Sequence, residues 1–229
     1  MREIILRGRG PNTLTLESLR RFSAELAEAG GDALLIRGEG SAFSAGLDLD
    51  ALGGDLGALL DAMEEAASAL FLHPAPTVAC VNGHAIAGGC LLAIACDHRV
   101  LSDRAEVKMG MTALALGLVY PPIVLEVLRY RVPSAALERV LLGAERFGPS
   151  EALALGLVDE LAADPRAVSR ERLARLADHP RAAYAHTKRA LRAPAIAMDP
   201  AERRLRLEEA AGAWDPEAVR ARMRGQRGA

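Results

Sequence analysis

Two stretches of small residues carry the backbone groups that could do chemistry in this chain. One of them, residues 76–102, reads "PTVACVNGHAIAGGCLLAIACDHRVLS". Its apolar segment over 89–96 predicts a buried helix that begins near Gly88 and Gly89. The first N–H groups of a helix have no intrahelical partner and lie at its positive dipole end, so they can bind an anion or a developing oxyanion. Without a Cβ, both glycines let a ligand oxygen approach, although tight packing between helix and strand favours glycine as well.

The other stretch, residues 38–52, reads "GEGSAFSAGLDLDAL". It joins an apolar run over 33–36 to a helical pattern over 56–72, and it ends with Asp48 and Asp50. Residues this small would let the backbone come close to another group. The titratable side chains near the two stretches are Asp48, Asp50, His84, Asp97, His98, Lys108 and Tyr120.

Apolar periodicity predicts the elements that must position these groups. Strands are expected at 3–8, 32–38, 76–82 and 98–102, with a weaker strand near 105–109, and helices at 15–30, 56–72 and 89–96. From Pro121 onward the pattern predicts only helices, at 122–131, 134–144, 150–155, 166–178, 181–193, 200–213 and 216–224. We therefore expect an α/β core over 1–160 and a helical C-terminal region over 161–229 that serves oligomerisation or covers a pocket.

Composition limits the classes of partner. The 229 residues are 51% hydrophobic and 25% charged with a formal net charge of −2, which is typical of one globular core. This charge and an aromatic content of 3% argue against nucleic-acid binding. No apolar run reaches membrane length, and the cysteines form no CxxC pair. We expect a cytoplasmic protein with no nucleic-acid partner, no membrane association and no metal site.

Both stretches together resemble the signature segments of the crotonase superfamily, the enoyl-CoA hydratase and isomerase group. The family form "F-S-A-G-x-D-L" is matched by Phe43-Ser44-Ala45-Gly46-Leu47-Asp48-Leu49, and "V-N-G-x-A-x-G-G-G" by residues 81–89. Further similar segments bring the resemblance to roughly residues 12 to 162. It implies a spiral of ββα units, a crotonase-like superhelix with a helical C-terminal region.

The resemblance also implies how a substrate would bind. The N–H groups of Leu47 and Gly88 would form an oxyanion hole for the thioester carbonyl of an acyl-CoA or acyl-carrier substrate. The neighbouring substrate-binding residues would be Phe43, Ser44, Ala45, Gly46, Asp48, His84, Gly89, Leu91 and Ala113. No cofactor is implied beyond the coenzyme A that is part of the substrate, and a homotrimer or hexamer is implied.

The sequence departs from the family at its two catalytic glutamates. The first falls on Leu91, and matching residues 113–117 to the family's "E-x-x-x-G" places the second at Ala113. A shift of this alignment by two residues gives Met111, which is equally unable to carry a proton. Among the remaining groups Tyr120 ranks first as a substitute acid, with an unperturbed pKa of about 10, ahead of His84 and Asp48.

Each of these side chains also has a purely structural interpretation. His84 can be a packed, hydrogen-bonded residue, Asp48 can fix its loop, and Asp97 can brace the end of the buried helix. Two functions stay open. The first is a lyase or isomerase of the enoyl-CoA hydratase/isomerase type with an atypical active site, and the second is a non-catalytic acyl-CoA-binding or scaffold homologue.

Overall fold

The structure, a computed structural model, describes residues 1–48 and 54–227, with side chains described through residue 223. Asp50, one of the sequence candidates, lies outside these residues. The N-terminal part alternates strands and helices: β1 (Arg2–Leu6), α1 (Leu16–Ala29), β2 (Leu34–Gly38), α2 (Leu56–Leu72), β3 (Thr77–Val81), β4 (Ala85–Ile86), α3 (Gly88–Ala95), β5 (His98–Ser102) and β6 (Met109–Gly110).

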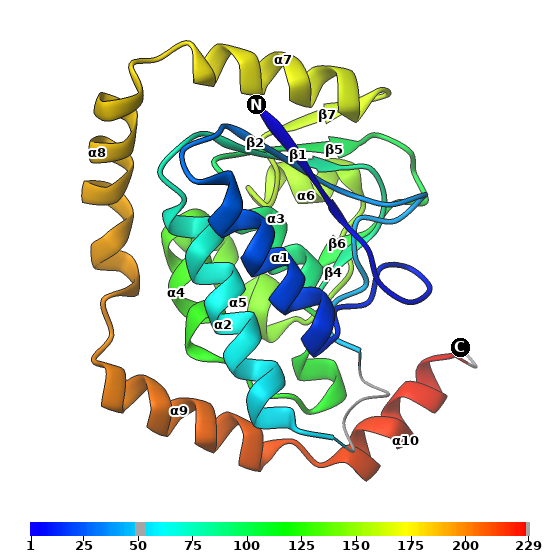
Figure 1. The fold of residues 1–229 in the computed structure, drawn as a ribbon. Helices are drawn as coiled ribbons and strands as arrows, with labels where there is room; N and C mark the ends of the chain where they lie inside the picture. Colours follow the sequence, from blue (N-terminus) through cyan, green and yellow to red (C-terminus); the bar gives the residue numbers. More distant parts are fainter. Residues whose placement is uncertain (49–53, 228–229) are drawn as a thin grey trace.

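The remaining elements are mostly helical. They are η2 (Leu114–Leu116), α4 (Pro122–Arg131), α5 (Ser134–Leu142), α6 (Pro149–Ala154), β7 (Glu160–Ala162), α7 (Pro165–Ala177), α8 (Arg181–Arg192), η3 (Ala193–Ile196), α9 (Pro200–Ala213) and α10 (Pro216–Arg227). Figure 1 shows the helices from α7 to α10 running around the outside of the molecule. No helix in the described ranges is long and apolar enough to cross a membrane.

Five strands form one parallel sheet in the order β1-β2-β3-β5-β7 within the described residues. The order advances in one direction along the chain, which gives a spiral, whereas a doubly wound sheet reverses its direction. A second, two-stranded parallel sheet joins β4 to β6. The α/β expectation is therefore confirmed.

Alternating side chains divide the core into two layers. Leu34 and Ile36 of β2 face a large cluster built on α1, α2, α3 and α4, whereas Leu35 faces Leu173 of α7 on the opposite side of the sheet. All five residues of β3 are buried, as expected for a central parallel strand covered on both faces. The helix α3 is buried from Gly89 through Ala95, because its sequence is apolar on every side.

Two strands were not predicted. Ala85–Ile86 was read as part of a small-residue turn but forms β4, and Glu160–Ala162 lies in a region predicted to be only helical but forms β7. Both are too short for period-two alternation to show, and they form because neighbouring backbone offers hydrogen-bond partners. β7 spans the expected boundary at residue 160, and α7 packs against the sheet.

Buried charge fastens α8 to the end of α3. Asp97 follows α3, and its carboxylate accepts hydrogen bonds from Thr77 N at 2.8 Å, Tyr184 Oη at 2.9 Å and Lys188 Nζ at 2.9 Å. Arg192 completes the group with an ion pair to the same carboxylate at 2.7 Å. Asp97 thus has the bracing role expected from the sequence, and Tyr184, Lys188 and Arg192 among its partners come from α8.

Candidate functional site

The two small-residue stretches lie directly against each other. Ser44 N donates to His84 O at 3.0 Å, and Ile86 N donates to Ser44 O at 2.9 Å. A Cβ added to Gly89 would lie 2.4 Å from Ser44 O, so a glycine is needed for this contact. Part of the small-residue composition therefore serves packing between the two segments, which is the alternative that the sequence left open.

The same contact brings two backbone N–H groups together. Gly46 has a φ of +86°, and a Cβ placed on it would lie 3.1 Å from Gly88 N. Leu47 N is bonded to the carbonyl carbon of Gly46, so the Leu47 and Gly88 N–H groups are neighbours. Neither donates to a backbone carbonyl in the described part of the chain, whereas Asp48 N donates to Leu14 O at 3.0 Å.

Helix α3 begins at Gly88, as the sequence predicted. The residue before it, Ala87, has φ of +49° and ψ of −112°, which is unusual for a residue with a Cβ. Its N–H donates to Gly110 O at 2.8 Å, so β6 holds the turn in this conformation. The first N–H groups of α3 have no intrahelical acceptor, and Gly88 borders the space between the two stretches.

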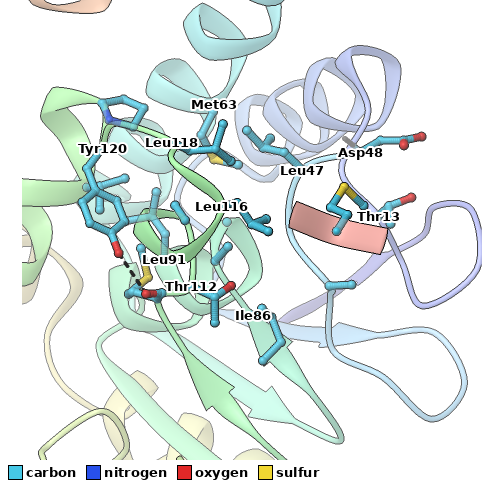
Figure 2. Close-up of a pocket in the computed structure, with 18 of the residues that line it drawn as sticks. Thr13, Leu47, Asp48, Met63, Ile86, Leu91, Thr112, Leu116, Leu118 and Tyr120 are labelled. Carbon is cyan, nitrogen blue, oxygen red and sulfur yellow. Dashed lines mark hydrogen bonds between the residues drawn. The ribbon is translucent and has the colours of Figure 1, made fainter. Parts of the chain in front are cut away.

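This space is a cavity of about 570 Å³, shown in Figure 2. Most of its wall is apolar and includes Met63 of α2, Leu118, Trp214 and Met223. Most of the predicted site residues line it: Ala45, Leu47, Asp48, Gly88, Leu91, Ala113 and Tyr120. A cavity of this size and character suits a small acyl group.

The other predicted site residues do not line the cavity. Phe43, Ser44, Gly46 and Gly89 are buried in the protein next to it. Ser44 Oγ donates to Asn12 O at 2.7 Å and accepts from Gly46 N at 3.2 Å, so its role there is to hold the loop.

His84 lies outside the cavity as well. Its ring is exposed, and Nδ1 accepts a hydrogen bond from Lys108 N at 3.0 Å. His98 is also remote from the cavity, beside Asp159 and Glu160. His84 is therefore hydrogen-bonded, as one interpretation expected, but it is not packed in the interior, and it is not among the residues that line the cavity.

Tyr120 lines the cavity with its ring but not with a free hydroxyl. Its Oη lies 2.8 Å from Met111 O and 3.1 Å from Leu141 O, and its single proton serves these two carbonyl acceptors. Burial raises its pKa to about 12. Figure 2 shows the bond to Met111. The expectation that Tyr120 supplies a proton to a substrate is not supported by this geometry, because the donor is already used.

Among the described residues that line this cavity, Asp48 is the only carboxylate. Asp48 belongs to the lining, forms an ion pair with Arg9 at 3.7 Å, and in Figure 2 points away from Leu91 and Tyr120. The buried Glu64, which follows Met63, accepts from Ile123 N at 2.7 Å and from Arg203 at 2.5 Å, and it does not line the cavity. Burial raises the pKa of Glu64.

The sequence led us to expect the C-terminal region to serve oligomerisation or cover a pocket, but no cavity-lining residue was predicted there. Trp214 and Met223 line the cavity, and Arg222 donates to Leu116 O at 3.1 Å. Thr112 and Arg146 are further lining residues that were not predicted. Apolar residues on an amphipathic helix look the same whether they face a core or a cavity, so the sequence carried no signal for them.

Comparison with known proteins identifies the family. The family profile described as enoyl-CoA hydratase/isomerase matches residues 3–213. The chain belongs to this family. The crotonase-like membership expected from the two signature segments is thereby confirmed.

Relatives support the same assignment. The mitochondrial enoyl-CoA delta isomerase 1 of Rattus norvegicus is 32% identical over 170 residues, which cover 70% of this chain and 59% of that protein. The chain thus spans about three-fifths of the length of this curated relative.

Solved structures confirm the spiral fold. The human mitochondrial delta3-delta2-enoyl-CoA isomerase superposes with a TM-score of 0.91 at 23% identity, covering 98% of this chain and 94% of that one. An enoyl-CoA hydratase from Mycobacterium marinum gives a TM-score of 0.79 at 25% identity, covering 96% and 93%.

Proposed function

We propose that this protein is an acyl-CoA enzyme of the hydratase/isomerase type that polarises the thioester carbonyl between the N–H groups of Leu47 and Gly88. The observation that supports the proposal is that these two N–H groups are neighbours without a backbone acceptor in the described residues, and that Leu47 and Gly88 both line an apolar cavity. As negative charge develops on the thioester oxygen, one such donor can contribute about 3 kcal/mol to the transition state. The resulting intermediate resembles an enolate.

The proposed enzyme works without the family's pair of glutamates. Leu91 and Ala113, which the family resemblance aligns with those positions, both line the cavity with side chains that cannot carry a proton. Hydration of an alkene needs a positioned acid or base, worth typically 10²- to 10⁴-fold for each group. We therefore expect slow hydration and a lyase or isomerase reaction that places less demand on protein carboxylates.

The same apolar wall supports a second candidate, a homologue that binds acyl-CoA without turning it over. Turnover of crotonyl-CoA, a 3-enoyl-CoA and a branched malonyl-type thioester separates the two functions. Conversion of any of these above the rate without protein supports the enzyme, and tight binding without conversion of all three supports the binding protein.

Gly88→Val tests the shared premise that the carbonyl binds beside Gly88. A Cβ there would lie 2.7 Å from Met63 Cε and 3.2 Å from Leu14 Cδ1, both ends of flexible side chains, so the fold can adapt while the space beside the donor is filled. We expect calorimetry with butyryl-CoA to show at least a tenfold loss of affinity.

Gly57→Val is the matched control. Gly57 lies in the first turn of α2, and a Cβ added to it would meet only Asp55 Oδ1, at 3.5 Å. It should bind butyryl-CoA as the wild type does. Unchanged affinity in a folded Gly88→Val protein would contradict the proposed site.

A further inference from the structure

The hydroxyl of Thr112 differs from the other polar side chains of the cavity wall because Thr112 is buried and its hydroxyl has no hydrogen-bond partner among the described residues. Thr13 Oγ1 lies 3.1 Å from Arg9 O, Trp214 Nε1 donates to Val119 O at 3.1 Å, and Tyr120 is engaged as described. Arg9 pairs with Asp48, and Arg146 is exposed to solvent. No hydrogen bond joins the Thr112 side chain to another residue in the described part of the chain.

Thr112 is also well buried and faces the cavity. Only 9% of it is exposed, and it belongs to the cavity lining, so this remaining surface faces the cavity. Figure 2 shows its oxygen directed toward the side where Leu116 and Ile86 lie, away from Tyr120. Without a partner in the protein, this hydroxyl keeps its hydrogen bonds only through an ordered water or a polar atom of a ligand.

The backbone places this hydroxyl near the proposed carbonyl site. Gly110 O accepts the hydrogen bond from Ala87 N, next to Gly88, and Thr112 follows Gly110 by two residues. Two residues span at most about 7 Å. Because Gly88 and Thr112 also line the same cavity, the acyl chain of a thioester whose oxygen lies at Gly88 can reach Thr112.

We infer that Thr112 is a specificity-determining residue that hydrogen-bonds an oxygen substituent, hydroxy or oxo, carried by the acyl chain close to the thioester. The inference rests on the proposed function, because it needs the thioester at Gly88. A thioester whose hydroxy or oxo group takes over the hydrogen bonds of a water at Thr112 keeps those bonds when it binds. A thioester with a plain hydrocarbon chain displaces the water and loses them, so it should bind less tightly.

Calorimetry with two thioesters tests this role. Wild-type protein should bind one enantiomer of 3-hydroxybutyryl-CoA about fivefold to tenfold more tightly than butyryl-CoA, the effect of one neutral hydrogen bond. Thr112→Val keeps the shape and removes the hydroxyl, so it should lose the preference for 3-hydroxybutyryl-CoA over butyryl-CoA. Thr112→Ser keeps a hydroxyl and should retain the preference.

The outcomes separate this inference from the proposed function. Binding of butyryl-CoA without a preference for either 3-hydroxy enantiomer, or a preference that survives in Thr112→Val, overturns the role of Thr112 and leaves the thioester site standing. Failure of folded wild-type protein to bind any of the thioesters overturns both.

Discussion

At the scale of single residues, the conformation of Ala87 is the most informative feature of the site. Ala87 lies directly before α3 and has a positive φ, and its N–H donates a hydrogen bond to Gly110 O in β6. The backbone conformation at the start of α3 is therefore held by a strand outside the helix. Residues with a Cβ are held in such regions at a cost of about 1–3 kcal/mol. Interactions with the surrounding structure, such as the hydrogen bond to Gly110 O, must offset this cost.

Ala87→Gly should therefore stabilise the protein. Glycine adopts this φ and ψ without strain, while its greater freedom in the unfolded chain removes about 0.5–1 kcal/mol of the gain. We expect the free energy of unfolding to rise by about 1 kcal/mol in urea titrations. Ala87→Val should lower it, because a β-branched side chain is less compatible with positive φ than alanine. A loss of stability in Ala87→Gly would show that the turn is not strained.

Tyr120→Phe should show whether the Tyr120 hydroxyl stabilises the fold or takes part in catalysis. Removing the hydroxyl leaves Met111 O and Leu141 O without this donor, which should lower the free energy of unfolding by about 1 kcal/mol. Turnover and affinity for acyl-CoA should stay within about twofold of wild type. A loss of turnover of a hundredfold or more at unchanged acyl-CoA affinity would restore Tyr120 as a proton donor.

Between elements, the buried charges around Asp97 connect α8 to the α3–β5 junction. Lys188 contributes Nζ to Asp97 at 2.9 Å and to Ala75 O at 3.0 Å. Burial lowers the pKa of Lys188 from its usual 10.5 to about 8, despite the opposing attraction of Asp97. The folded chain thus releases this proton at a lower pH than the unfolded chain does.

The stability of the protein should depend on pH through this lysine. Between pH 8 and 10 Lys188 is more often protonated in the unfolded chain than in the folded chain. The contribution of Lys188 to the free energy of unfolding therefore rises with pH in this range, by up to about 1.4 kcal/mol per pH unit. This contribution is lost again as the pH falls to about 8 and below. Lys188→Met should remove this rise. Denaturant titrations of both proteins at pH 8, 9 and 10 measure the difference, and parallel curves would contradict it.

Sequence patterns predicted the long elements well and the short ones poorly. Strands such as β3 were predictable because five consecutive buried residues leave a clear apolar run, and Gly88 was predictable as the start of α3 from composition. β4 and β7 were not, since strands of two and three residues depend on neighbouring backbone. The orientation of the Tyr120 hydroxyl depends on carbonyls from two distant segments, which no local pattern encodes.

For the whole molecule, the helical tail completes the cavity wall within one chain. The tail carries the apolar residues Leu205, Leu207, Ala211 and Trp214, and an apolar face of this kind would favour contact with another copy if it were left uncovered. Leu207, Ala211 and Trp214 pack with Leu60 and Leu118 in the same chain, and Leu205 remains 56% exposed. Most of this apolar face is therefore packed within the chain.

A homotrimer or hexamer remains our prediction, drawn from the family resemblance. Leu142, Leu191 and Leu205 are exposed leucines that could contact another copy. Sedimentation equilibrium at micromolar concentration should give three or six times the chain mass of 24.2 kDa. A single species at the mass of one chain would contradict the prediction.

The position of Trp214 gives the protein a built-in optical probe. The chain contains one tryptophan, which is 6% exposed, lines the cavity and donates its indole N–H to Val119 O. Fluorescence excited near the indole absorption band therefore comes from a single known position in the cavity wall. A thioester that enters the cavity changes the polarity around this ring, so a shift in the emission maximum reports occupancy without a label, in the unmodified protein.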